Sequence, residues 1–215
     1  MSPMRPLVVA LLVLLAASPA VAANKTVPLP PPRAEGGKPL LQALWLRSST
    51  RKFTSRPIPR PVLGELLWAA FGINRPKEGK RTAPSAHNRQ EVDIYVTTAE
   101  GAYLYDAKGH ALRPVVGRDL RALTGRQKFP ATAALNLVYV VDLARMPGVP
   151  RAAAIEAAAV SVGAIAENVY LYCASEGLGT VVRGWIDRPE LARALGLKAD
   201  QYILFAQTVG YRAGK

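Results

Sequence analysis

Hydrophobic residues in this chain recur at two spacings, one typical of helices and one typical of strands. Helical spacing predicts helices over residues 40–46, 61–71 and 151–175, with a shorter one from the N-cap candidate Asp187 to Leu195. Runs rich in β-branched and aromatic residues predict strands over residues 92–98, 103–105, 110–115, 135–141, 179–185 and 202–209. The polar, basic stretch 74–83 is expected to be a loop. Because strands and helices do not alternate strictly, the pattern favours an α+β fold.

The two most continuous apolar segments indicate where the core lies. Residues 135–141 are apolar at nearly every position, which is typical of a strand buried on both faces. The predicted helix 151–175 would be about 37 Å long at about 1.5 Å per residue. It carries small side chains on all sides, with Gly163 near its middle. Such a surface lets another helix approach closely, so we expect this helix to be buried in a core or to lie in or beside a dimer interface.

The beginning of the chain differs from the rest and is interpreted as two segments. Residues 1–22 have the organisation of a secretory signal, with a positive start, an apolar run over 7–17 and a small-residue cleavage site at 20–22. An uncleaved membrane anchor is the alternative, although the run is short for a span of about 20 residues. Residues 23–39 are rich in Pro and Gly and predict a poorly ordered linker. The folded domain is expected from residue 40 to residue 215, exported and in the periplasm.

Composition and charge argue against several classes of protein. The chain has 28 Lys and Arg against 15 Asp and Glu, a formal net charge of +13. The basic residues are scattered and form no stripe on a predicted helix, which argues against nucleic-acid binding. A phosphate-bearing cofactor or an anionic membrane surface fits the charge better. Cys173 is the only cysteine and there are two histidines, so an internal disulfide or a zinc site built on thiolates is not expected.

Three segments carry side chains or glycines suited to a ligand. Residues 47–53 place two arginines four apart with hydroxyls between them, and such side chains hold phosphate groups. Residues 84–90 form a polar loop that offers hydroxyl, imidazole and amide groups. Residues 176–180 follow the long helix, where Gly177 suits a left-handed cap and Gly179 permits close approach to the backbone. Taken singly, each segment could be an ordinary solvated turn or a plain helix cap.

Taken in order, the three segments resemble the FMN-dependent nitroreductase family. That family has an Arg-x-Ser-x-Arg-x-Phe start, a Pro-Ser-Ala-x-Asn loop and a Gly-Leu-Gly turn after a long helix, and the resemblance spans about residues 40–211. Residues 101–106 and 125–129 are similar to the azoline-oxidase branch, whose members form thiazoles and oxazoles. The sequence departs from the family pattern at Glu91 and at Glu167, and it has almost no C-terminal extension with a further phosphate ligand.

The resemblance implies a nitroreductase-like fold, with a mostly antiparallel sheet, and one FMN per subunit at the interface of a homodimer. The first segment would hold the phosphate and the pyrimidine edge, with Arg51 near the N1–C2=O edge. The loop would contact the ring from the partner subunit, and the glycine turn would lie against the flavin. The residues implied to bind FMN are Arg47, Ser48, Ser49, Arg51, Pro84, Ser85, Ala86, His87, Asn88, Leu178, Gly179 and Arg212. No metal ligand and no catalytic acid or base is implied.

The function that this resemblance implies is ping-pong oxidoreduction. A small-molecule donor would reduce the flavin, and an acceptor such as a nitroaromatic or a quinone would then take the electrons. A flavin-dependent dehydrogenase that oxidises its substrate is one alternative, and a non-catalytic exported flavin-binding protein is another. Hydrolase chemistry is disfavoured because His87 and His110 stand in no recognised spacing to a nucleophilic serine. The chain also lacks a glycine fingerprint for dinucleotides after a strand.

Overall fold

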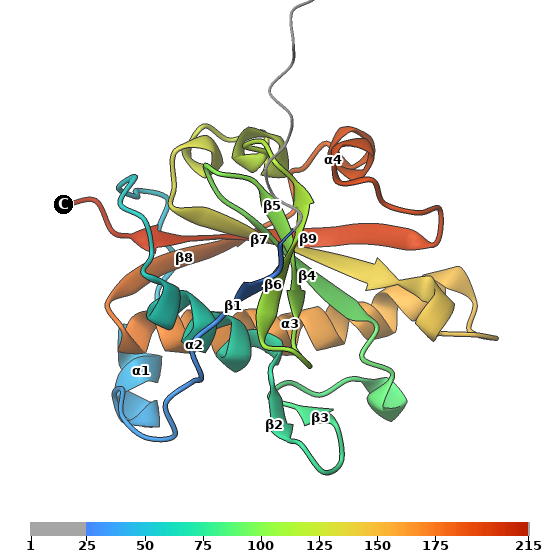
Figure 1. Cartoon of the computed structure of the whole chain (residues 1–215), viewed down its shortest axis with the longest axis horizontal. Coiled ribbons are helices and arrows are strands. Elements are labelled where there is room, and N and C mark those ends of the chain that lie inside the picture. Colours follow the sequence, from blue (N-terminus) through green and yellow to red (C-terminus); the bar gives the residue numbers. More distant parts are fainter. Residues whose placement is uncertain (1–24, 215) are drawn as a thin grey trace, which may run out of the picture.

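The computed structural model describes residues 25–214, which form one mixed structure of helices and a seven-stranded sheet (Figure 1). The strand order is β1-β6-β5-β4-β7-β9-β8, and every neighbouring pair is antiparallel. The strands are β1 (Val27–Pro28), β4 (Val92–Thr97), β5 (Ala102–Asp106), β6 (Ala111–Val116), β7 (Leu135–Asp142), β8 (Leu178–Arg183) and β9 (Gln201–Tyr211). The predicted α+β class and the mostly antiparallel sheet are confirmed.

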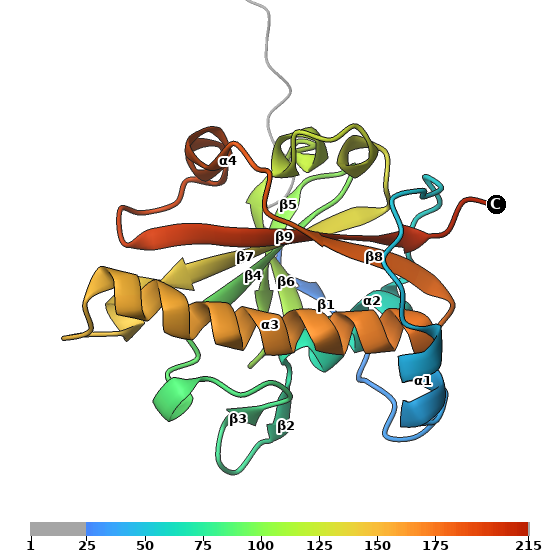
Figure 2. The same ribbon diagram turned by 180° about the vertical axis from the view of Figure 1, so that it is seen from behind.

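The helices cover both faces of this sheet. Figures 1 and 2 show α1, α2 and α3 on one face and α4 on the other. The α-helices are α1 (Leu40–Leu46), α2 (Arg60–Phe71), α3 (Arg151–Ser175) and α4 (Arg188–Leu195). Short 3-10 helices are η1 (Ala86–Asn88), η2 (Arg121–Thr124), η3 (Phe129–Ala131) and η4 (Leu143–Arg145). The long helix was therefore predicted with its observed bounds.

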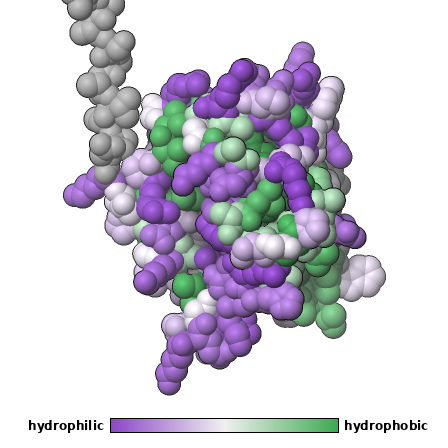
Figure 3. All heavy atoms as spheres, turned by 90° about the vertical axis from the view of Figure 1, so that its right-hand side faces the viewer, coloured by the Kyte–Doolittle hydropathy of each residue, from purple (hydrophilic) through white to green (hydrophobic). Residues whose placement is uncertain are grey.

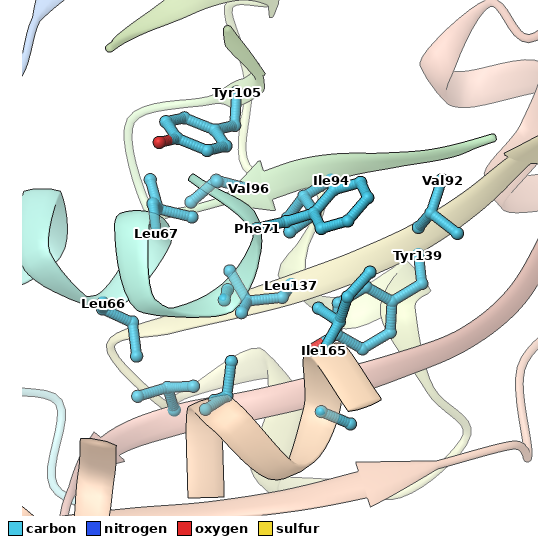
Figure 4. Packing of buried hydrophobic residues seen from close by; sticks show 14 of the residues in the cluster. Leu66, Leu67, Phe71, Val92, Ile94, Val96, Tyr105, Leu137, Tyr139 and Ile165 are labelled. Carbon is cyan, nitrogen blue, oxygen red and sulfur yellow. The ribbon is translucent and has the colours of Figure 1, made fainter. Parts of the chain in front are cut away.

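Strand β7 lies in the middle of the sheet and is buried on both faces, as its sequence predicts. Leu137 and Tyr139 face the larger core, which α2 and α3 cover, whereas Val138 and Val140 face a smaller core under α4. Side chains alternate between the faces of a strand, so an apolar run fills both cores at once. Figure 4 shows the larger core, where side chains of α2 such as Phe71 meet those of β4, β7 and α3.

Helix α3 covers the sheet along its length. In length and composition it is also the described helix that could span a membrane. Its inward residues, among them Val162, Ile165 and Val169, are buried in the larger core. These contacts identify α3 as a core helix of the domain, and its other side is free to meet a partner.

The N-terminal arm, residues 25–39, corrects one prediction. A poorly ordered linker was expected there, yet β1 pairs with β6 and the Leu29 amide donates to the His110 carbonyl at 3.0 Å. The His110 ring in turn contacts the Pro30 carbonyl through Nε2 at 2.9 Å. Proline removes amide donors but keeps its carbonyl, so an extended Pro-rich segment can still be held by donors of its neighbours. The predicted signal at 1–22 lies outside the described residues.

A hairpin that was not predicted and an early strand end are two further differences from the sequence prediction. The stretch expected to be a loop contains a small hairpin, β2 (Ile73–Arg75) and β3 (Lys80–Arg81), that turns through Gly79 at φ +64°. The strand expected over 179–185 ends at Arg183, because the carbonyl of Trp185 leaves the sheet to accept from the Arg126 amide at 3.0 Å. The first difference comes from local pairing of residues five to eight apart, and the second from a contact with a residue 59 positions away in the chain.

The arm is fastened to α2 and to the end of α3 by one guanidinium group. Nη2 of Arg33 donates to Glu65 at 2.7 Å and lies 3.2 Å from the Glu176 carboxylate. The hydroxyl of Tyr172 donates to Glu65 at 2.9 Å. The hydrogen bond from Arg33 is the main reason that the pKa of Glu65 lies below its usual value, against the opposing effect of burial. A group with a lowered pKa stabilises the fold above its usual pKa and loses that effect as the pH falls.

Substituting Glu65 by Gln should therefore lower the free energy of unfolding at neutral pH, and the loss should shrink below about pH 4.5. We expect a loss of about 1 kcal/mol, because the pair is charge-assisted but Arg33 is half-exposed. Urea unfolding of both proteins across pH 3 to 7 measures it. Glu78→Gln, which breaks the exposed pair with Lys80, is the matched control and should change little. A Glu65→Gln loss that does not depend on pH would contradict the assignment.

Candidate functional site

The first and third predicted segments meet at the end of α3. The chain that leaves α1 runs beside β8, where Ser49 pairs with Thr180 in a parallel bridge and the Thr50 amide donates to the Thr180 carbonyl at 3.1 Å. The C-terminal residues close the arrangement, since the Ala213 amide donates to the Lys52 carbonyl at 3.1 Å. Three parts of the chain that are far apart in sequence thus lie side by side: the segment after α1, the start of β8 and the C-terminal residues. We call this arrangement the wall.

Gly179 lies at the closest point of this wall. A Cβ built on Gly179 would lie 2.4 Å from Cγ2 of Thr50 and 2.9 Å from Cγ of Arg212, closer than real Cβ contacts allow. The sequence interpretation had a ligand approach this glycine, but in the protomer Thr50 fills that space. Gly177, two residues earlier, has φ +72°, the left-handed conformation predicted for the cap of the long helix.

Cationic side chains without carboxylate partners gather around the wall. Arg47, Arg51 and Arg212 take part in none of the ion pairs found within residues 25–214. Nη1 of Arg212 donates to Oγ of Ser48 at 3.0 Å, and its Nε donates to the Leu178 carbonyl at 3.3 Å. Guanidinium groups and serine hydroxyls with donors to spare are suited to an oxyanion such as a phosphate.

The second predicted segment is strained and lies elsewhere in the protomer. His87, Asn88 and Gln90 have φ of 53°, 54° and 50°, a region that residues with side chains seldom adopt. The loop is held by the Ser85 hydroxyl, which accepts from the Gln90 amide at 2.9 Å. Figures 1 and 2 show η1 apart from α1 and from the start of β8. One protomer therefore does not bring the Pro84–Asn88 segment to the other two.

Tyr170 of α3 belongs to the wall and was missed from the sequence. Its hydroxyl lies 2.9 Å from Oγ of Ser49 and accepts from the Val182 amide at 3.1 Å. The guanidinium of Arg47 lies over its ring, 5.5 Å from the centroid. The available signal was weak: a tyrosine two helical turns before the glycine turn, on a helix whose other side chains are mostly small.

Arg183 is a second residue that sequence reasoning missed. It is buried in the sheet, with Nη1 donating to the Thr124 carbonyl at 2.6 Å and Nη2 to Oδ1 of Asn136 at 3.0 Å. Burial lowers its pKa to about 10. The segment 125–129 packs over it, and the ring of Phe129 lies 5.8 Å from that of Phe53 in the first segment. An arginine within an apolar strand pattern would ordinarily be expected at the surface, which is why it escaped notice.

Comparison with known proteins identifies the family. Residues 46–211 match the nitroreductase family. A protein of Methanocaldococcus jannaschii assigned to the nitroreductases is 31% identical over 181 residues, which is 80% of this chain and 90% of its own length. A crystal structure from Ralstonia eutropha, also assigned to the nitroreductases, is 45% identical with a TM-score of 0.84 and covers 88% of this chain and 90% of its own. The chain belongs to the nitroreductase family.

The finer assignment to the azoline-oxidase branch has less support. A structure from the microcin synthetase complex of Escherichia coli has a TM-score of 0.68 and covers 89% of this chain and 79% of its own, but it is 19% identical. A similarity at that level shows a shared fold. The family is thus established, and the branch remains a hypothesis.

The close contact at Gly179 leads to a test by substitution. Gly179→Ala should lower the free energy of unfolding by about 1–3 kcal/mol, because Thr50 and Arg212 must move to admit the Cβ. Gly184→Ala, just after the same strand, is the control: its Cβ would lie 3.5 Å from Phe205, an ordinary contact, and should cost less than about 0.5 kcal/mol. Equal denaturation midpoints for the two variants would contradict the packing described for the wall.

Proposed function

We propose that this protein is an FMN-dependent oxidoreductase and that it works as a homodimer. The observation that carries the proposal is the group of three arginines without carboxylate partners, set beside serine hydroxyls at the end of α3. Like charges that lie close together repel one another, so binding an anion among them is favoured. Because the chain belongs to the nitroreductase family, whose members typically bind FMN, we infer that this anion is the phosphate of FMN.

The residues present fit this cofactor. Arg47, Ser49 and Arg212 would hold the phosphate, Arg51 would face the pyrimidine edge, and the backbone at Leu178 would lie along the ring. FMN, when bound, supplies the hydride chemistry through its N5 atom. The chain's own part is to bind and orient the ring and to place positive charge where the reduced flavin becomes anionic. No acid or base from this chain is required for that role.

A second copy of the chain would complete the site. The loop Pro84–Asn88 lies away from the wall in one protomer, so it can reach a flavin there only from a partner. The outward faces of α1 and α3 are suited to such a contact: Leu41 is 72% exposed, Trp45 90% and Val160 72%. Figure 3, seen from the end at which α3 begins, shows hydrophobic side chains at the lower margin on one side of the molecule. These apolar surfaces favour a homodimer through α1 and α3.

Two functions are alternatives to a reductase that uses nitroaromatics or quinones, and experiment can separate them. A flavin-dependent dehydrogenase of azoline-oxidase type would take electrons from its substrate, and a non-catalytic exported protein would only carry the flavin. The visible spectrum of the purified protein tests the cofactor, since bound flavin makes the protein yellow. Bleaching by NADH or NADPH supports the reductase, bleaching only by an oxidisable heterocycle supports the dehydrogenase, and a colourless protein with no affinity for FMN rejects all three.

Export is proposed from the first 22 residues, with release into the periplasm after cleavage. Cleavage near Ala22 would leave the arm intact, because its contacts with β6 and α2 begin at Val27. Mass spectrometry of the protein from its native cell measures the mature N-terminus. An intact Met1 in a cytoplasmic fraction would reject this part of the proposal without affecting the flavin site.

Arg47→Ala should weaken FMN binding about 10- to 150-fold, the equivalent of about 1.5–3 kcal/mol for a hydrogen bond to a charged group. Riboflavin lacks the phosphate, so its affinity should stay near that of the wild type. Arg51→Ala should weaken both flavins and make the bound flavin harder to reduce. Fluorescence titration of the apoprotein with each flavin measures these effects. Equal losses for FMN and riboflavin in Arg47→Ala would exclude Arg47 as a phosphate ligand.

Gly163→Leu tests the proposed dimer. Gly163 is exposed in the protomer and a Cβ built on it would meet nothing within 4 Å, so the protomer itself tolerates a larger side chain. At a close helix contact the leucine should cost about 1–3 kcal/mol and weaken the dimer about 5- to 150-fold. Sedimentation at several concentrations measures the change, with Gly163→Ala as the matched control. A wild-type monomer that is saturated with FMN would exclude an interfacial site.

A further inference from the structure

Tyr170 makes two separate contacts with the first segment, although it lies more than 100 residues away from it. Its hydroxyl meets Ser49 and its ring lies under Arg47, at the distances given above. The same hydroxyl is bound by the Val182 amide of β8 at 3.1 Å. A single side chain of α3 thus touches two residues that the proposed function assigns to the phosphate.

The chemistry of the groups fixes one of the two hydrogen-bond directions. The Val182 amide can only donate, so the phenol oxygen accepts from it. In the contact of 2.9 Å between the phenol and Oγ of Ser49 either hydroxyl could donate, and the proposal takes the phenol as the donor. Ser49 is exposed and, in this arrangement, keeps its own hydroxyl hydrogen for a ligand. A chain of hydrogen bonds in one direction also makes the last donor stronger.

The ring acts on Arg47 in another way. A guanidinium over an aromatic face is attracted by the electron density of the ring, which limits the orientations that a long side chain can take. Arg47 is exposed and makes no ion pair within the described residues. The Tyr170 ring is therefore the contact that holds its guanidinium near Ser49. A side chain ordered in advance loses less entropy when it binds its ligand.

We propose that Tyr170 is a positioning residue for the anion site, which turns the Ser49 hydroxyl toward the ligand and orders Arg47 beside it. The inference rests on the proposed function in that the natural ligand is the phosphate of FMN. It goes further by assigning a role to a residue that touches no ligand atom itself. A purely structural role, in which Tyr170 only caps the exposed edge of β8 at Val182, is the alternative.

Two substitutions and their combination separate these roles. Tyr170→Phe keeps the ring and removes the hydroxyl, so FMN affinity should fall about threefold to tenfold, as for loss of one hydrogen bond. Ser49→Ala should give a similar loss, and the double variant should lose little more, because both changes remove the same chain of hydrogen bonds. Riboflavin affinity should stay unchanged in all three. Tyr170→Leu, which also removes the ring from under Arg47, should bind FMN more weakly than Tyr170→Phe.

Tyr172→Phe is the matched control, since it lies on the same helix and its hydroxyl binds Glu65 and the Val62 carbonyl instead. It should lower the denaturation midpoint and leave FMN affinity unchanged. Losses that add in the double variant, or an equal fall in riboflavin affinity, would overturn the role of Tyr170 and leave the FMN site standing. Inorganic phosphate is titrated in parallel, so that a protein which binds phosphate but not FMN still tests Tyr170. A wild-type protein that binds neither overturns both proposals.

Discussion

The contact between the segment after α1 and the start of β8 is the constraint on which the rest of the site depends. It exists because residue 179 has no side chain: any Cβ there would overlap Thr50 and Arg212. With the strand and the segment side by side, the bridge from Ser49 to Thr180 fixes the register of the segment. That register places Arg47 at the end of α3 and leads the chain toward the C-terminal residues. The arrangement of the proposed anion site is thus a consequence of backbone packing before any ligand arrives.

The basic residues of the chain differ in whether the fold supplies them with partners. The net charge of +13 includes cations that form ion pairs within the fold, such as Arg33 with its two carboxylates and Arg145 with Asp93. Arg183 has partners of another kind: its guanidinium donates hydrogen bonds to neutral oxygens, although burial disfavours its charged form. Arg47 and Arg51 make no ion pair within residues 25–214, and Arg212 meets only the neutral oxygens of Ser48 and Leu178. Charge that no carboxylate offsets is available for binding an anion, and here such charge stands beside serine hydroxyls.

The sequence predicted elements well where one physical signal dominates. Residues 135–141 are apolar on both sides because β7 separates two cores, and the bounds of α3 follow from Pro150 before it and Gly177 after it. For the candidate site, the sequence indicated residue types suited to a phosphate but not the contacts among them. Tyr170, Arg183 and the ordered arm were missed for one reason. Each is defined by partners distant in the chain, namely Ser49, Thr124 and His110, and hydrophobic spacing carries no information about such pairs.

Two features within residues 25–214 have no explanation in the protomer itself: the exposed apolar face of α1, which adjoins the proposed site, and the strained loop around His87, which lies away from it. Helix α1 exposes most of its apolar side chains, and Arg47, its C-cap, is also the first residue of the wall. The loop around His87 holds three left-handed residues, and such strain persists only where the surrounding structure imposes it. Under the proposed function, whatever covers α1 is continuous with the anion site. A ligand bound at that junction would contact both subunits of the proposed dimer, so its binding free energy would also stabilise their association. Cofactor binding and assembly would then be one coupled equilibrium, and residues such as Gly163 and Arg47 would influence both.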